Sequence, residues 1–184
     1  MKVVLLDRDL RYDGLQLSTA FIDEHASGDT DAVVLFTGEA DVPVEHLVDK
    51  EDAEAGAFIY SPSMAHAIIE HKGLELSEAV WRQRMLGRLA AQWISSRSGG
   101  KVEVRGDDLF VGEGKLSVSV ATGSPRGCLI HLGLNVEVEG TPVRTAGLRD
   151  LRIPPTEFLQ ALARLYAEEM ASAKHATTKV RSVR

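Results

Sequence analysis

Val104–Val138 reads VRGDDLFVGEGKLSVSVATGSPRGCLIHLGLNVEV, and this stretch decides the fold. The sequence Gly112-Glu113-Gly114 predicts a tight hairpin turn, and a second loop is predicted around Gly123–Gly127. Between them, Lys115–Thr122 alternates polar and apolar residues, with Leu116, Val118 and Val120 predicted to share one face. Consecutive β-strands are therefore expected here.

Several polar residues interrupt these predicted strands: Lys115, Asp107, Asp108, His131 and Asn135. Polar groups on a buried strand cost free energy unless they are paired or used. Gly133 lies in the same strand as His131, and a strand glycine often permits close approach of a ligand. We therefore expect a site in this segment.

Outside this stretch, short apolar runs predict strands and helical spacing predicts helices. The predicted strands are 3–6, 32–36, 56–60 and 101–105. Helices are predicted over Leu15–His25, starting after Asp13-Gly14, over Leu76–Ile94, capped by Ser77, and over 154–173. A further helix is predicted to begin at Ser61-Pro62-Ser63, with Met64, Ile68 and Ile69 on its apolar face. An acidic loop with one helical turn is expected over Gly38–Ala55. This order favours an α+β domain with a largely antiparallel sheet covered by helices on one side.

Composition sets the broad class. A chain of 184 residues, 44% hydrophobic and 26% charged, is expected to form one globular domain over 1–184, with a polar, basic tail at 174–184. Its net charge of −6 argues against nucleic-acid binding. The single cysteine, Cys128, excludes an internal disulfide and suits a reducing compartment. The first residues resemble neither a signal peptide nor a membrane anchor, so a cytoplasmic protein is expected.

Two motifs carry a resemblance to biotin– and lipoate–protein ligases. Arg105–Ser117, RGDDLFVGEGKLS, resembles the R-x-N-D-L-x-V-x-G-x-K-x-S-G segment of lipoate ligases and the corresponding biotin-ligase segment, and HLGLNV (131–136) resembles the strand that follows. The resemblance implies that Lys115 contacts an acyl carboxylate and the phosphate of an acyl-adenylate. It places Asp108 near the nucleotide or a metal, with ATP and Mg²⁺ as the implied cofactors.

Nearly the whole chain resembles the family called domain of unknown function 366. The matching motifs are YDGLQLS, EHLVDKED, WRQRML, GDDLFV, KLSVSVAT, LIHLGLNV and ATTKVR. This resemblance implies the fold shared by biotin and lipoate ligases and class II aminoacyl-tRNA synthetases.

The chain departs from the ligases at one important place. Where lipoate ligases carry an R-R-x-S-G-G-G loop, this sequence has Ala57–Met64, AFIYSPSM, and Ser117-Val118 replaces a Ser-Gly pair. Two hypotheses follow: an acyl-transfer or ligase-like enzyme, and a non-catalytic module that retains the fold as a homodimer or partner-binding subunit. A third is a metal-dependent hydrolase or transferase that uses the acidic loop Glu45–Asp52.

The candidate site follows from these motifs. Lys115 and His131 are the candidate catalytic residues, and the ligand is expected to be a small carboxylate or a nucleotide conjugate. The candidate ligand-binding residues are Arg105, Asp108, Ser117, Asn135, Arg11 and Gln16. No metal ligands are assigned, and His66 and His71 are not spaced as a zinc pair on a helix.

Purely structural interpretations stay open for most of these residues. Asp107-Asp108 also suits a turn, and His131 also suits a core histidine bonded to its neighbours. Asn135 also suits a strand end, and Arg11 and Gln16 also suit a surface position and a helix cap. Cys128 is expected to be a buried thiol, with an acyl-thioester nucleophile as the alternative.

Overall fold

A five-stranded sheet forms the centre of the computed structural model, which describes residues 1–183. Its strands, in spatial order, are β1 (Lys2–Leu5), β2 (Ala32–Val42), β3 (Ile59–Lys72), β8 (Gly127–Glu137) and β7 (Ser117–Ser124). Strand β1 pairs parallel to β2, and every other pairing in this sheet is antiparallel. The predicted α+β class with a largely antiparallel sheet is confirmed.

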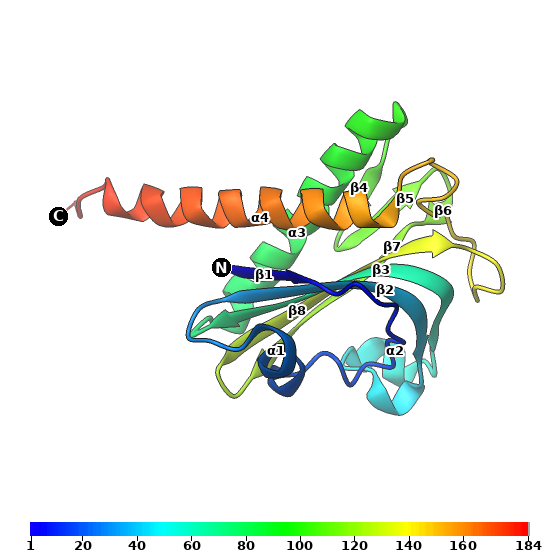
Figure 1. The fold of residues 1–184 in the computed structure, drawn as a ribbon, viewed down its shortest axis with the longest axis horizontal. Coiled ribbons are helices and arrows are strands. Elements are labelled where there is room, and N and C mark those ends of the chain that lie inside the picture. The colour runs from blue at the N-terminus through cyan, green and yellow to red at the C-terminus, as the bar shows by residue number, and fades with distance from the viewer. Residues whose placement is uncertain (184) are drawn as a thin grey trace.

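A small second sheet and the helices complete the fold (Figure 1). The small sheet contains β4 (Glu103–Arg105), β5 (Asp108–Val111) and β6 (Gly114–Lys115). The helices are α1 (Thr19–Ala26), α2 (Lys50–Glu54), α3 (Leu76–Ser98) and α4 (Pro155–Thr178), with a single 3₁₀ turn η1 at Val44–His46. Among residues 1–183, no helix is both long and apolar enough to span a bilayer.

Helices cover both faces of the large sheet, not one face as predicted. Leu86 of α3 and Phe158 of α4 pack with Ile130 and Leu132 on one face. Ile22 of α1 packs with β2 and β3 on the other face. Because both sides are covered, most positions of the central strands are buried, and little alternation of apolar and polar residues remains in their sequences.

The predicted helix opened by Ser61–Ser63 is wrong, because these residues belong to the long strand β3. Both faces of β3 are buried, so its apolar residues fall at spacings that also match a helix. Pro62 has no N–H to donate, and it lies within the register shift against β2, next to the shift against β8 between Ser63 and Met64. The irregularity accommodates a proline that a regular central strand would not.

Other element boundaries in the structure also differ from the predicted ones. The first helix begins at Thr19, where Ser18 Oγ accepts a hydrogen bond from the Phe21 N–H at 3.3 Å, and not at Asp13-Gly14. Ser77 does not cap α3, because the helix already includes it. Strand β2 extends to Val42, so the predicted acidic loop is shorter and contains both η1 and α2. These boundaries depend on tertiary pairing that local propensity does not encode.

The predicted strand 115–122 is split at Leu116. Leu116 is fully buried among the residues packed against α3 and α4, whereas Val118 packs on the opposite side of the sheet. The split lets one continuous segment serve two sheets, with Lys115 in the small one and Ser117 onward in the large one.

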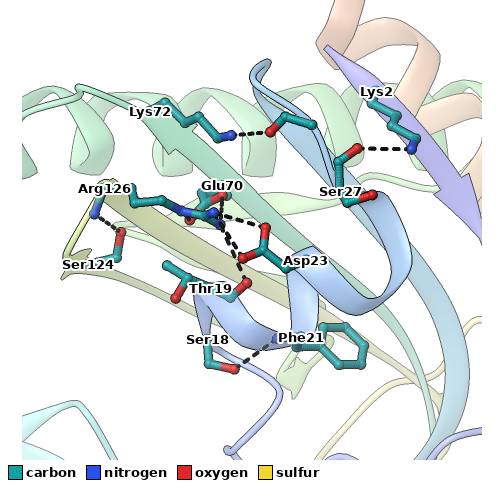
Figure 2. A network of polar contacts seen from close by, with 11 residues as sticks. Lys2, Ser18, Thr19, Phe21, Asp23, Ser27, Glu70, Lys72, Ser124 and Arg126 are labelled. Carbon is teal, nitrogen blue, oxygen red and sulfur yellow. Dashed lines mark hydrogen bonds and ion pairs between the residues drawn. The ribbon is translucent and has the colours of Figure 1, made fainter.

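A buried carboxylate ties the sheet to α1. Glu70 of β3 has a fully buried side chain, and its two oxygens accept hydrogen bonds from Arg126 Nε and Nη2 at 3.2 and 2.8 Å. The same guanidinium binds both oxygens of Asp23 at 2.9 and 3.0 Å (Figure 2). Arg126 therefore compensates the one charge that β3 buries here.

We expect Arg126→Leu to lower the melting temperature by roughly 10 °C, because Glu70 would then be buried without its cation. Scanning calorimetry measures this shift. Arg164→Leu is the control, because its partner Glu168 and Arg164 itself are about 60% exposed, and a change under about 2 °C is expected. Equal decreases in melting temperature for the two variants would contradict the role of Arg126 as the cation that compensates Glu70.

Candidate functional site

A cavity of about 360 Å³ opens on the face of the sheet that carries α1. Strands β7 and β8, the small sheet, the loop before α1, the segment around η1 and α2, and the start of β3 all contribute to its wall. The polar lining residues include Tyr12, His46, Asp49, Asp52, Asp107, Asp108, Lys115, Ser117, Ser119, His131, Asn135 and Thr145.

Lys115 forms an ion pair at this cavity. Its Nζ lies 2.8 Å from Asp108 Oδ2, and both side chains are about 30% exposed. Burial raises the pKa of Asp108 above its ordinary value; Lys115 opposes this rise, while Asp107 and Asp52 add to it. Two of the predicted site residues are thus in direct contact.

The main-chain N–H and carbonyl of Lys115 are both hydrogen-bonded to the segment 144–146. Its N–H donates to the Arg144 carbonyl at 2.9 Å, and its carbonyl accepts from the Ala146 N–H at 3.0 Å. The Asn135 Nδ2 also donates to the Lys115 carbonyl, at 3.1 Å. Asn135 therefore positions Lys115, so it combines a structural role with a place in the cavity wall.

Ser117 joins the small sheet to the large one. Its Oγ accepts a hydrogen bond from the Leu109 N–H at 2.9 Å, and the residue is fully buried. It contributes to the cavity wall, but its hydroxyl oxygen is already bonded to the main chain.

Two stacked histidines and a tyrosine lie beneath the cavity. His131 Nε2 lies 3.1 Å from His66 Nδ1, and His66 Nε2 lies 3.4 Å from the Gly38 carbonyl. The ring of Tyr12 stacks on His131 with centroids 4.2 Å apart. Burial lowers the pKa of His66 to about 3 and lowers that of His131 well below its ordinary value, so both rings are neutral.

The space beside Gly133 is occupied by the protein itself. A Cβ atom at this position would lie 2.9 Å from Met64 Cε and 3.2 Å from His131 Cε1 and Nε2. The glycine therefore makes room for the His131 ring and Met64. The sequence had associated it with a ligand instead.

Three candidate residues lie away from the cavity wall. Arg105 pairs with Glu103 and stacks over the Phe110 ring, while Arg11 pairs with Asp41 and Glu39. Gln16 Oε1 accepts from the Asp13 N–H at 3.0 Å, which fixes the turn before α1. Their predicted part in ligand binding gains no support from these contacts.

Sequence reasoning missed much of the wall. Tyr12 is attached to β2 by two main-chain hydrogen bonds across a loop, and Phe58 and Tyr60 come from the segment that replaces the ligase loop. Asp49 and Asp52 belong to the acidic loop, for which the sequence suggested a solvated surface or, as the alternative, a metal site. No set of three or more His, Cys, Asp or Glu residues within 1–183 is arranged to hold a metal ion.

Cys128 is buried as predicted. Its Sγ lies 3.1 Å from the Leu74 carbonyl, and burial raises its pKa, which disfavours the thiolate. It does not line the cavity.

The fold is the one shared by biotin and lipoate protein ligases, of the class II synthetase type. Biotin protein ligase from Aquifex aeolicus in complex with biotin and ATP superposes with a TM-score of 0.60 at 12% identity, over 95% of this chain and 72% of that one. A putative lipoate protein ligase from T. acidophilum with bound lipoic acid gives 0.60 at 14% identity, over 92% and 86%. These identities establish the fold alone.

The chain belongs to the family described as domain of unknown function (DUF366), whose model matches residues 1–181. A protein of unknown function from Pyrococcus horikoshi has the same structure, with a TM-score of 0.94 and 33% identity over the full length of both chains. An uncharacterized protein from Methanocaldococcus jannaschii is 29% identical over 177 residues, which cover 92% of this chain and 80% of that protein. The resemblance inferred from the motifs is confirmed.

We expect the charges around Asp108 to act on its pKa in opposite directions. Lys115→Met should raise the pKa of Asp108 further, because it removes the neighbouring positive charge. Asp107→Asn should lower it, because it removes a negative charge. Carboxyl-selective NMR titration measures both shifts.

Lys101→Met serves as the control, because Lys101 is 82% exposed and pairs with Glu103 rather than Asp108. A pKa of Asp108 that did not respond to Lys115→Met would show that the ion pair does not form in solution.

Proposed function

We propose that this protein is a ligase-like or acyl-transfer enzyme that binds a small carboxylate or an acyl-adenylate in the cavity beside Lys115. The observation that carries the proposal is the half-buried ion pair between Lys115 and Asp108, on a lysine whose main-chain N–H and carbonyl are both hydrogen-bonded. A positioned cation of this kind stabilises a carboxylate or phosphate oxygen. Among the described lining residues, it is the only lysine or arginine.

The size and lining of the cavity support a small ligand. About 360 Å³ falls at the lower end of the usual range for small-molecule sites. The wall is apolar around Phe58, Ile59 and Val118, and its polar groups include Asp108 of β5, Lys115 of β6 and Asn135 of β8. An acyl chain beside the apolar wall with its carboxylate at Lys115 fits this distribution.

The residues at the cavity favour a nucleotide that carries its own metal. Asp107 and Asp108 would hold Mg²⁺ that also contacts phosphate oxygens, because Mg²⁺ usually binds one or two carboxylates together with substrate phosphates. Free ATP would meet four carboxylates, from Asp49, Asp52, Asp107 and Asp108, and a single lysine. When bound, the ion would neutralise phosphate charge.

A non-catalytic module is the second candidate, and one observation favours it. Residues 57–60 enter the cavity wall as Ala-Phe-Ile-Tyr, where lipoate ligases carry arginines and glycines. Against it, the cavity beside Lys115 is retained, which a module that kept only the fold would not need. A homodimer and a cytoplasmic location remain predictions under either candidate.

We expect Lys115→Ala to weaken binding by roughly 10- to 100-fold, because it removes a charge-assisted hydrogen bond. A thermal-shift screen with biotin, lipoate, octanoate, ATP with Mg²⁺ and sulfamoyl acyl-adenylate analogues measures this. A bound probe at about 100 times its Kd should raise the melting temperature of the wild type by roughly 5 °C or more.

Lys101→Ala is the matched control and should keep the full shift, because Lys101 lies on the exposed surface. Shifts that are identical in Lys115→Ala and the wild type for every probe would refute the proposal. Binding without turnover of any acyl-adenylate would favour the non-catalytic module.

A further inference from the structure

We infer that the ligand carries an N–H or O–H donor at the end that reaches the cavity floor, because residues 1–183 leave one acceptor nitrogen of His131 without a partner there. This inference rests on the proposed function and names the class of ligand more narrowly: a carboxylate or acyl-adenylate whose acyl group ends in a hydroxyl or amide donor. Its chemistry is separate from that of Lys115, which binds the anionic end.

The first step is the protonation pattern of His66. The Gly38 carbonyl can only accept a hydrogen bond, so His66 Nε2, which lies 3.4 Å away, must carry the proton. His66 is neutral, so its Nδ1 has no proton and is an acceptor.

The second step deduces which ring nitrogen of His131 carries the proton. His131 Nε2 lies 3.1 Å from His66 Nδ1 and must donate to it. In a neutral ring, the remaining nitrogen, His131 Nδ1, then holds a lone pair. One main-chain carbonyl thus fixes the tautomers of both rings.

The third step concerns the surroundings of His131 Nδ1. It makes no hydrogen bond to any residue within 1–183, although the residue is only 2% exposed. It is also not sealed off, because the only fully enclosed side-chain nitrogen or oxygen without a partner in that range is Arg84 Nε. His131 lines the cavity, and Nδ1 is the ring nitrogen that no residue within 1–183 occupies.

The fourth step is the rigidity of the ring. Tyr12 stacks on one side of His131 with centroids 4.2 Å apart, and His66 stacks with centroids 5.4 Å apart. Gly133 leaves just enough room for the ring edge beside Met64. The acceptor nitrogen of His131 is therefore held in a fixed position. A ligand without a donor would leave this buried nitrogen unpaired and would bind with lower affinity.

Long-range ¹H–¹⁵N NMR on the ligand-free protein tests the tautomers directly. We expect protonated Nε2 and unprotonated Nδ1 in both His66 and His131, unchanged between pH 8 and pH 6. A proton on His131 Nδ1, or a doubly protonated ring at pH 6, would overturn the inference. This measurement needs no ligand.

Paired probes test the ligand class. Saturated carboxylates of six, eight and ten carbons are compared with the same acids bearing a terminal hydroxyl, by calorimetric titration. We expect the hydroxy acid of the best-fitting length to bind roughly five- to tenfold more tightly in the wild type. His131→Phe, which keeps the ring and removes the acceptor, should abolish or reverse this preference.

The outcomes separate the two proposals. Equal affinity for both members of every pair, with binding still dependent on Lys115, would overturn the inference about His131 alone. Binding that did not depend on Lys115 would overturn the proposed function. The preference in the unmodified protein is informative even if His131→Phe does not fold, and a melting curve establishes whether it does.

Discussion

The pairing of β3 with β2 and β8 is the constraint on which the rest of the structure depends. Strand β3 is paired along nearly its whole length on both sides, and both of its faces are covered. The same strand carries three buried ionisable side chains, His66, Glu70 and His71. Its register sets His66 opposite Gly133 and beside His131, so the strand that holds the fold together also sets the cavity floor.

The sequence predicted the site residues around Lys115 better than the residues of the cavity floor, and the reason is physical. Alternation and glycine turns reveal a half-exposed hairpin, and the ligase-like motif there identified Lys115 and Asp108. Strand β3 is buried on both faces, so its apolar spacing also matches a helix and its assignment was wrong. The contacts of Tyr12 and His66 depend on pairings between distant segments, which no local pattern encodes.

The wall around Lys115 shows how this chain differs from the ligases it resembles. Phe58 and Tyr60 enter the cavity from the segment that replaces an arginine- and glycine-rich loop. The segment Ala57–Met64 contains no lysine or arginine, and Phe58 and Tyr60 add apolar surface to the wall. The remaining charges are one lysine and several aspartates, a balance that suits a single carboxylate or a phosphate accompanied by a metal ion.

The three buried histidines differ in whether the protein itself supplies hydrogen-bond partners for both ring nitrogens. His71 uses both ring nitrogens inside the protein, since Nδ1 lies 2.7 Å from Asp31 Oδ2 and Nε2 lies 2.7 Å from Tyr166 Oη. His66 also uses both. Within residues 1–183, His131 uses only Nε2, and its Nδ1 has no hydrogen-bond partner and is not fully enclosed. Since folded proteins satisfy nearly all buried polar atoms, the histidine that the fold leaves half-satisfied is the one whose remaining partner comes from outside the chain.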